Sequence, residues 1–332
     1  MHAVNDAVAR PRATELDGVL AAGVHTACGD RAQLTHWEAC ALSDRPGCRV
    51  VHYQVGVQPA EAAAPQCWQC VGKFYGRHET ALKVVAALRM LEASHFTPRC
   101  GVAFPGVIIY HAPWGLLLLT YQPGVPVLNV LDTAYQPILT AIGQGLAALH
   151  TTPGPLDRLA PPTAIVAELR QRVQHLCTWM PAAASALGHI VAFLARHAPP
   201  AIDRPTLVHG DFGPAQLLWD DGRLAMLDFD RCGLGDPALD LGTLLAQLRR
   251  RALMRVGTTR DLAELRTLVL DAYHRNVAQS SGFAERVAWY ERVVLLRKVH
   301  FLAGQEDGEK RAQAMALLRL LAGLTEAYQP DC

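Results

Sequence analysis

The chain has 332 residues, 51% of them hydrophobic and 18% charged, which is typical of a globular protein with a large buried core and excludes a disordered one. Its formal net charge of +1 at pH 7 lacks the large positive excess that is typical of nucleic-acid-binding proteins. No apolar run approaches the roughly 18 residues of a membrane span, and the first residues lack the basic and apolar regions of a secretory leader. We therefore expect a cytoplasmic protein with no nucleic-acid, membrane or protein partner.

The amino-terminal part of the chain is predicted to be mainly β. Residues 1–40 are polar and Ala-rich and favour a helical lead-in. Residues 48–57 alternate in polarity and are rich in β-branched side chains, which predicts a strand after the turn at 44–47. A second strand is expected at 67–75, and apolar residues at helical spacing, Val84, Leu88 and Leu91, predict a helix at 79–94. Strands at 107–110 and 115–121 are expected to complete this part of the chain.

From Leu131 onward the apolar pattern changes to helical spacing. Helices are expected at approximately 134–150, 163–178, 183–197, 240–255, 261–278, 283–303 and 308–328. The segment 121–130 contains Pro123, Gly124 and Pro126 and is the natural boundary. The sequence thus predicts a β-rich part at 1–122 and a helical part at 123–332.

Three acid-bearing motifs follow one another between the predicted third and fourth helices. They are His209-Gly210-Asp211, then Leu227-Asp228-Phe229-Asp230, and then Gly235-Asp236-Pro237-Ala238-Leu239-Asp240. Between the first two, an Asp-Gly turn joins two short apolar runs, which is a strong signal for a β-hairpin. Such a hairpin folds the chain back, so we expect Asp211 and Gln216 to face Asp228. A base beside a set of oxygen ligands would suit Mg²⁺ and phosphoryl transfer.

This ordered set resembles the catalytic core of the aminoglycoside phosphotransferase and choline kinase-like family, small-molecule relatives of the protein kinases. The family motif is His-Gly-Asp, a metal-binding Asn five residues after the Asp, and an Asp in a strand-end motif of Asp-Phe-Asp type. His209, Asp211 and Asp228 match it, whereas Gln216 stands at the Asn position. Residues 146–150 also resemble the family's helix before the catalytic loop, and residues 119–124 resemble its interlobe hinge.

The resemblance implies an α+β, two-lobed protein-kinase-like fold. Residues 1–122 would form a small antiparallel β-sheet N-lobe that binds the nucleotide, with the helical lead-in. Residues 123–332 would form a larger helical C-lobe with the catalytic loop, the metal site and the acceptor pocket. The implied activity is transfer of the γ-phosphoryl group of ATP or GTP to a hydroxyl of a small molecule, with Mg²⁺ as cofactor.

The resemblance also assigns roles to the acidic and amide residues. Asp211 would be the catalytic base, Asp228 would coordinate Mg²⁺, and Asp230 is a second candidate ligand. Gln216 could supply an amide oxygen as Asn does, but it is longer by one methylene. Either the site has shifted to accept Gln216, or a second metal is weakly bound, or catalysis is impaired. The implied role of His209, Asp236 and Asp240 is structural: Asp240 would cap the following helix or brace the loop of His209.

Lys73 is the candidate lysine for the nucleotide phosphates. The chain contains only four lysines among 31 basic residues, and one of them lies inside a predicted apolar strand. The alternative is an edge-strand lysine that discourages aggregation. Its usual acidic partner is not evident, because Glu79 lies near the start of the next helix and Glu92 near its end. In the hinge, Thr120 and Gln122 are predicted to contact the nucleotide.

The acceptor and the activity itself are less constrained by the sequence. Residues 241–332 carry 14 Arg and Lys against 10 Asp and Glu, which favours a neutral or anionic hydroxylated acceptor over a polycationic aminoglycoside, although charged helix faces are usually only solvated. The competing hypothesis is a catalytically weak nucleotide-binding regulatory protein of the same fold. Gln216 and the missing partner of Lys73 are the observations in its favour.

Overall fold

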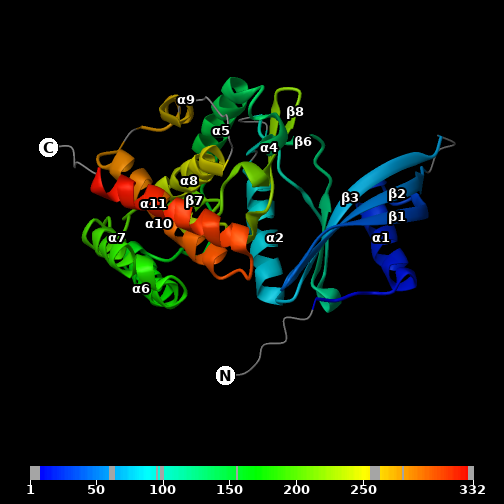
Figure 1. The fold of residues 1–332 in the computed structure, drawn as a ribbon. Coiled ribbons are helices and arrows are strands. Elements are labelled where there is room, and N and C mark those ends of the chain that lie inside the picture. The colour runs from blue at the N-terminus through cyan, green and yellow to red at the C-terminus, as the bar shows by residue number, and fades with distance from the viewer. Residues whose placement is uncertain are drawn as a thin grey trace. The chain divides into compact units, whose positions relative to one another are not determined.

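The computed structural model describes residues 8–59, 64–94, 96–97, 101–154, 156–254, 262–278 and 280–327. The chain divides into two compact units, and Figure 1 labels most of their helices and several of their strands. The first unit comprises Met1–Gly124 together with Ala225–Asp230, and the second comprises Val125–Leu224 together with Arg231–Cys332. The segment that carries Asp228 and Asp230 therefore belongs to the amino-terminal unit although it lies far along the chain.

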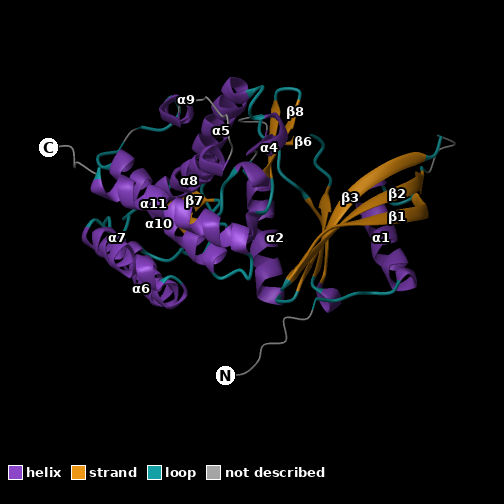
Figure 2. Ribbon diagram, viewed as in Figure 1, coloured by secondary structure: helices purple, strands orange, loops and turns teal. Residues whose placement is uncertain are grey.

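The first unit is built on an antiparallel sheet, of which Figure 2 labels β1, β2 and β3. The sheet has five strands in the order β1-β2-β3-β5-β4. Its strands are β1 (Gln33–Arg45), β2 (Cys48–Gln58), β3 (Gln66–Tyr75), β4 (Val107–His111) and β5 (Leu116–Thr120). The four predicted strands, β2 to β5, are confirmed to within two residues at their ends.

The prediction that residues 1–40 form only a helical lead-in is wrong for residues 33–40. Helix α1 (Ala13–Cys28) is present, but β1 begins at Gln33 and pairs antiparallel with β2. Strand β1 lies at the edge of the sheet, is mostly exposed, and shifts register twice along its pairing with β2. Because these features remove the regular apolar alternation that signals a strand, only the pairing with β2 defines it.

One face of this sheet holds the core of the first unit. Leu20 and Val24 of α1 are fully buried and pack in one cluster with Cys70 and Phe74 of β3. Successive side chains of a strand point to opposite faces, so Lys73 projects from the other face of β3. Helix α2 (His78–Ala93) contacts β3, β4 and β5 and buries its apolar positions at the predicted helical spacing.

The segment Ala225–Asp230 is held in the first unit by backbone and ring contacts. The amide of Met226 donates to the carbonyl oxygen of Ala103 over 2.8 Å. The ring of Phe229 packs edge-on against Phe104, with centroids 6.4 Å apart. These contacts place the two carboxylates of the Asp-Phe-Asp motif in the unit that carries Lys73.

The second unit is mainly helical, and all seven predicted helices are confirmed within a few residues. Its helices are α4 (Val127–Val130), α5 (Tyr135–His150), α6 (Pro162–Trp179), α7 (Ala184–Arg196), α8 (Ala238–Met254), α9 (Leu262–His274), α10 (Phe283–Ala303) and α11 (Gly308–Glu326). Helix α10 contacts α6, α8 and α11, and α5 contacts α9. A Cβ atom at Gly143 would lie 2.5 Å from the carbonyl oxygen of Val269, so glycine permits the close approach of α5 and α9.

Short strands carry the motifs that follow α7. Strands β7 (Thr206–Val208) and β10 (Gly233–Gly235) pair antiparallel, and β6 (Val125–Pro126), β8 (Leu217–Asp220) and β9 (Arg223–Met226) form a sheet in the order β6-β8-β9. The predicted turn between β8 and β9 has positive φ at both Asp221 (41°) and Gly222 (89°), as a tight hairpin turn requires. The fold is thus α+β, with a small antiparallel sheet and a larger helical part. Among the described residues, no helix is both long and apolar enough to cross a membrane.

Candidate active site

The His209-Gly210-Asp211 loop directly follows β7 and is shaped by close backbone packing. Gly210 has φ of +80°, a conformation that favours glycine, and a Cβ atom there would overlap the carbonyl oxygen of Arg231. The pairing of Val208 with Gly233 brings this loop beside the start of β10. The loop is therefore fixed against the residue that follows the Asp-Phe-Asp motif.

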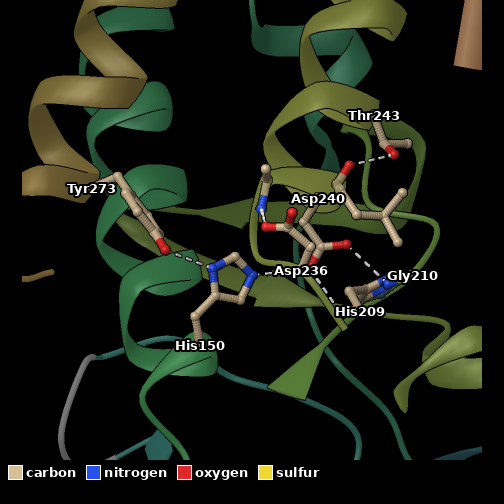
Figure 3. A network of polar contacts seen from close by, with 9 residues as sticks. His150, His209, Gly210, Asp236, Asp240, Thr243 and Tyr273 are labelled. Atoms are coloured by element: carbon tan, nitrogen blue, oxygen red, sulfur yellow. Dashed lines mark hydrogen bonds and ion pairs between the residues drawn. The ribbon is translucent and has the colours of Figure 1, made fainter. Parts of the chain in front are cut away.

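A fully buried carboxylate, Asp240 in the first turn of α8, holds this loop from within (Figure 3). Its Oδ2 accepts the amide of His209 over 2.7 Å and its Oδ1 accepts the amide of Gly210 over 2.9 Å. Its Oδ2 also lies 3.1 Å from Nε2 of His150 on α5. A carboxylate without exposed surface is tolerated only when its lone pairs are used, and here three donors surround it.

His150 extends this network to α9. Because a carboxylate can only accept, Nε2 of His150 is the donor to Asp240, and Nδ1 then accepts from the hydroxyl of Tyr273 over 3.0 Å. Burial, followed by the charges of Asp240 and Asp236, raises the pKa of Tyr273, so its hydroxyl remains a donor at neutral pH. Figure 3 shows this chain of contacts from Tyr273 to Gly210. The sequence indicated the helix of His150 by resemblance but not this role.

Asp236 begins the same helix and has different partners. Its Oδ1 accepts the amide of Ala238 over 3.0 Å at the start of α8, and its Oδ2 accepts Nε of Arg286 over 2.9 Å. Burial raises the pKa of Asp236 despite the opposing effects of these two donors. The sequence left open whether Asp240 caps the helix or braces the loop; in the structure Asp236 caps the helix and Asp240 braces the loop.

Asp211 itself opens into a pocket of about 410 Å³ in the second unit. Its side chain is 50% exposed, and its Oδ2 lies 4.0 Å from Nε of Arg231. That separation is within ion-pair range but too long for a hydrogen bond. The carboxylate of Asp211 is thus placed where a small molecule in the pocket could reach it.

Gln216 lines the same pocket at the end of a short 3₁₀ turn, Pro214–Gln216. Its side-chain Oε1 is buried, and within the described residues it accepts no hydrogen bond. An orphaned buried acceptor is costly and is a reason to look for a bound partner. An amide oxygen is among the ligands that Mg²⁺ accepts, so the donor type at Gln216 fits the expected cofactor.

Lys73 pairs with two carboxylates within the first unit, and one of these carboxylates also accepts a hydroxyl. Its Nζ lies 2.7 Å from Oδ1 of Asp228 and 2.5 Å from Oδ1 of Asp230, and the hydroxyl of Tyr75 donates to the same Oδ1 of Asp230 over 2.8 Å. Burial lowers the pKa of Lys73, but the charges of Asp230 and Asp228 outweigh it, so the net pKa is raised. Burial, with Asp228 nearby, raises the pKa of Asp230.

The acidic partners of Lys73 therefore come from the Asp-Phe-Asp motif. In the described part of the chain neither glutamate of α2 pairs with it: Glu79 is exposed, and Oε1 of Glu92 accepts the amide of Val107 over 3.0 Å. The alternative of an exposed edge-strand lysine is wrong, because β3 lies between β2 and β5 and Lys73 is only 8% exposed. Tyr75 is a further member of this cluster that the sequence did not indicate.

Asp228 has an unusual backbone. Its φ is +67°, a left-handed conformation that residues other than glycine rarely adopt and that concentrates at functional sites. Its side chain remains 44% exposed beside Lys73. The described residues contain no group of three or more His, Cys, Asp or Glu side chains that would enclose a metal. A Mg²⁺ ion in a nucleotide site usually has only one or two carboxylates, together with phosphate oxygens, so the carboxylates of Asp228 and Asp230 fit it.

Thr120 and Gln122, at the end of β5, contact each other. Nε2 of Gln122 donates to Oγ1 of Thr120 over 3.2 Å, and this Oγ1 also accepts the amide of Gly106 over 2.8 Å. Their contact with a nucleotide stays a prediction. The structure thus gathers Lys73, Asp228 and Asp230 in the first unit, and Asp211 and Gln216 in the second. The expectation that Asp211 faces Asp228 concerns both units and also stays a prediction.

The fold is kinase-like, with a small antiparallel sheet that holds the buried Lys73 and a helical part that holds the braced His-Gly-Asp loop. Residues 71–285 match the sequence model of the phosphotransferase enzyme family (APH), and the chain belongs to this family. No curated protein sequence matches the chain significantly.

Several solved structures share the fold. A thermostable mutant of aminoglycoside phosphotransferase APH(4)-Ia, in a ternary complex with ADP and hygromycin B, is 16% identical with a TM-score of 0.62, covering 90% of this chain and 96% of that one. Macrolide 2′-phosphotransferase MphH from Brachybacterium faecium is 19% identical with a TM-score of 0.58, covering 91% and 98%. APH(2″)-IIa, in a ternary complex with streptomycin and ATP, is 15% identical with a TM-score of 0.54, covering 96% and 99%.

Proposed function

We propose that this protein transfers the γ-phosphoryl group of ATP or GTP to a hydroxyl of a small molecule, with Mg²⁺ as cofactor. The observation that carries the proposal is the position of Asp211, which opens into a pocket from a loop braced by the buried Asp240. The family of the chain supports the reaction class, and two of the similar structures contain ADP or ATP.

In the proposed reaction Asp211 is the catalytic base. The acceptor oxygen attacks the γ-phosphorus, its proton passes to the carboxylate of Asp211, and the bond to the bridging oxygen breaks so that the nucleoside diphosphate leaves with the electron pair. Asp211 makes no hydrogen-bond-length contact with Arg231, so that neighbour leaves its oxygens available to a hydroxyl. A positioned base contributes about 10²–10⁴-fold to the rate.

The nucleotide would be bound mainly by the first unit, residues 1–122 in the sequence-based division. Lys73 would contact the phosphates, and its permanent positive charge is maintained by Asp230 and Asp228. Asp230 accepts from the ammonium group of Lys73 and from the hydroxyl of Tyr75, which limits the conformations of this carboxylate. Thr120 would contact the nucleotide at the end of β5, together with its neighbour Gln122.

Mg²⁺ would be held by Asp228 and Gln216, with Asp230 as a second candidate ligand. The support is an exposed carboxylate at Asp228, a free lone pair on the buried Oε1 of Gln216, and an Oδ2 of Asp230 that Lys73 and Tyr75 do not use. When bound, the ion neutralises charge on the phosphate oxygens. Gln216 belongs to the second unit and the two aspartates to the first.

The decisive test of the proposed function is Asp211→Asn. Asn keeps the shape of the side chain but cannot take the proton, so phosphoryl transfer should fall by at least about a hundredfold while the Kd for MgATP changes little. Turnover is measured by mass spectrometry over a panel of hydroxylated metabolites with ATP and with GTP. More than about a tenth of the wild-type kcat in the variant would exclude Asp211 as the base.

The competing proposal is a catalytically weak nucleotide-binding regulator. Two observations favour it: Gln216 replaces the expected Asn, and neither glutamate of α2 pairs with Lys73 in the described residues. A regulator would show nucleotide-dependent thermal stabilisation without turnover of any acceptor. A kinase should show at least slow Mg²⁺-dependent ATP hydrolysis, so the two measurements together separate the proposals.

A further inference from the structure

The pocket that contains Asp211 is strongly basic. Four cationic residues line it, and Asp211 is the single acidic residue among its lining. The cations are Arg231 after the Asp-Phe-Asp motif, Arg250 on α8, and Arg297 and Lys298 on α10. A positive excess of this size inside a concave site concentrates anions and repels cations.

Two of the four cations already have acidic neighbours. Arg297 pairs with Glu168 of α6. Arg231 lies within ion-pair distance of Asp211. Each of these two therefore has an acidic neighbour within the protein, and Arg297 shares its neighbour Glu168 with Arg172.

Arg250 and Lys298 are not balanced in this way. Over the described ranges of the chain, Arg250 has no hydrogen-bond or ion-pair partner, and Lys298 has no ion pair. Instead, Nζ of Lys298 lies 4.4 Å from the centroid of the Phe301 ring. Burial and the neighbouring Arg250 lower the pKa of Lys298, with Asp211 partly opposing them. The positive charges of Arg250 and Lys298 thus repel each other, and a bound anion would offset this electrostatic repulsion.

Much of the remaining wall of the pocket is apolar. The apolar part is formed by side chains of α8 and α10, namely Leu239, Ala246, Val294, Leu295 and Phe301. Ligand sites combine such apolar walls with a few placed polar groups that set specificity. Among the polar groups here, beside Gln216, Thr243 and Gln247, are a carboxylate for a hydroxyl and a pair of cations for an anion.

We propose that the acceptor carries a carboxylate or a phosphate group in addition to its hydroxyl, and that Arg250 and Lys298 bind this anionic group. The inference deepens the proposed function and rests on it for the identity of the site. It assigns substrate recognition to α8 and α10, and it excludes polycationic acceptors, which these two residues would repel. If Arg250 and Lys298 instead bind the phosphates of the nucleotide, replacing them should weaken the binding of MgATP.

Binding is tested first, because it does not depend on turnover. Ligand-observed NMR is run with matched sets of probes: gluconate, glucose and glucosamine, then glycerate, glycerol 1-phosphate, glycerol and serinol. We expect the anionic probes to bind, with the carboxylate and phosphate members showing which anion is preferred. In Arg250→Gln/Lys298→Gln their affinity should fall at least about tenfold, since a hydrogen bond to a charged group contributes that much or more. Arg319→Gln, an exposed arginine of α11 outside the pocket, is the matched control and should bind them as wild type does.

Catalysis is tested on the same sets with MgATP. We expect the anionic members to be phosphorylated, the double variant to raise their KM at least about tenfold, and the Kd for MgATP to stay within about twofold. The inference is overturned if neutral or cationic probes bind as well as the anionic ones, if no anionic probe binds, or if the double variant weakens MgATP and leaves the probes unaffected. Anion binding without any transfer or ATP hydrolysis would refute the proposed function and leave the anion site in place.

Discussion

The brace on the catalytic loop makes a quantitative prediction for Asp240→Asn. Asn has the same shape, but one of its two terminal atoms becomes an NH₂ donor. The two carboxylate oxygens of Asp240 accept the amides of His209 and Gly210, at 2.7 and 2.9 Å. Whichever way the Asn amide is turned, one of these backbone N–H groups then faces a donor. His150 can adapt by exchanging its tautomer, but a backbone amide cannot.

The expected cost of Asp240→Asn is about 2–4 kcal/mol, because one hydrogen bond to a charged group is lost and a buried donor is left unsatisfied. For a unit of this size that corresponds to a fall in Tm of roughly 5–15 °C. The matched control is Asp307→Asn at the start of α11, where the side chain is 44% exposed and accepts the amides of Glu309 and Lys310. Asn is an equally good helix cap, so this change should cost only a few tenths of a kcal/mol.

Thermal and urea unfolding of both variants measure these costs in stability. Kinetics of phosphoryl transfer measure the effect of the substitution on the position of the Asp211 loop. The loop of Asp211 should loosen, so kcat of Asp240→Asn should fall at temperatures where the variant is still folded, while the Kd for MgATP stays near wild type. A Tm for Asp240→Asn within about 1 °C of the Asp307→Asn control would show that the buried carboxylate does not brace the loop, and the reasoning would fail.

Three further predictions concern the metal ligands and the acceptor cations. Asp228→Ala should remove Mg²⁺-dependent ATP binding in a calorimetric titration, whereas Lys73→Ala should cost mainly nucleotide affinity; unchanged affinity in Asp228→Ala would contradict the assignment. Gln216→Asn should not raise turnover, because the shorter side chain would leave its amide oxygen about 1.3 Å away from a metal position that is adapted to Gln. A several-fold gain in kcat would instead indicate that Gln216 has impaired an originally more active enzyme. Because burial, and after it the charge of Arg250, lower the pKa of Lys298, its charge is lost as pH rises through a range below the usual one for lysine. Affinity for an anionic probe should therefore fall with rising pH, and Lys298→Arg should remove that fall. An identical pH profile in both proteins would refute the hypothesis that deprotonation of Lys298 causes it.

Most of the secondary structure and the ordered set of acidic motifs could be predicted from the sequence, because both are local properties. The helices of the second unit and the hairpin turn at Asp221-Gly222 follow from apolar periodicity and turn chemistry, which depend on residues a few positions apart. The same is true of the His209-Gly210-Asp211 motif, whose spacing to Asp228 was enough to indicate the family. Strand β1 was missed because an exposed edge strand with two register shifts has no local pattern of its own.

The partners of these residues were decided only by the tertiary structure. Lys73 meets Asp228 and Asp230, more than 150 positions away, and Asp240 reaches back to the amides of His209 and Gly210. Pairings of this kind depend on how buried surfaces pack, and no local pattern in the chain encodes them. The sequence by itself determined which side chains are candidates for phosphoryl-transfer chemistry. The fold determined which carboxylate braces the loop and which ones hold the lysine, because burial and hydrogen-bond geometry exist only once the chain is packed.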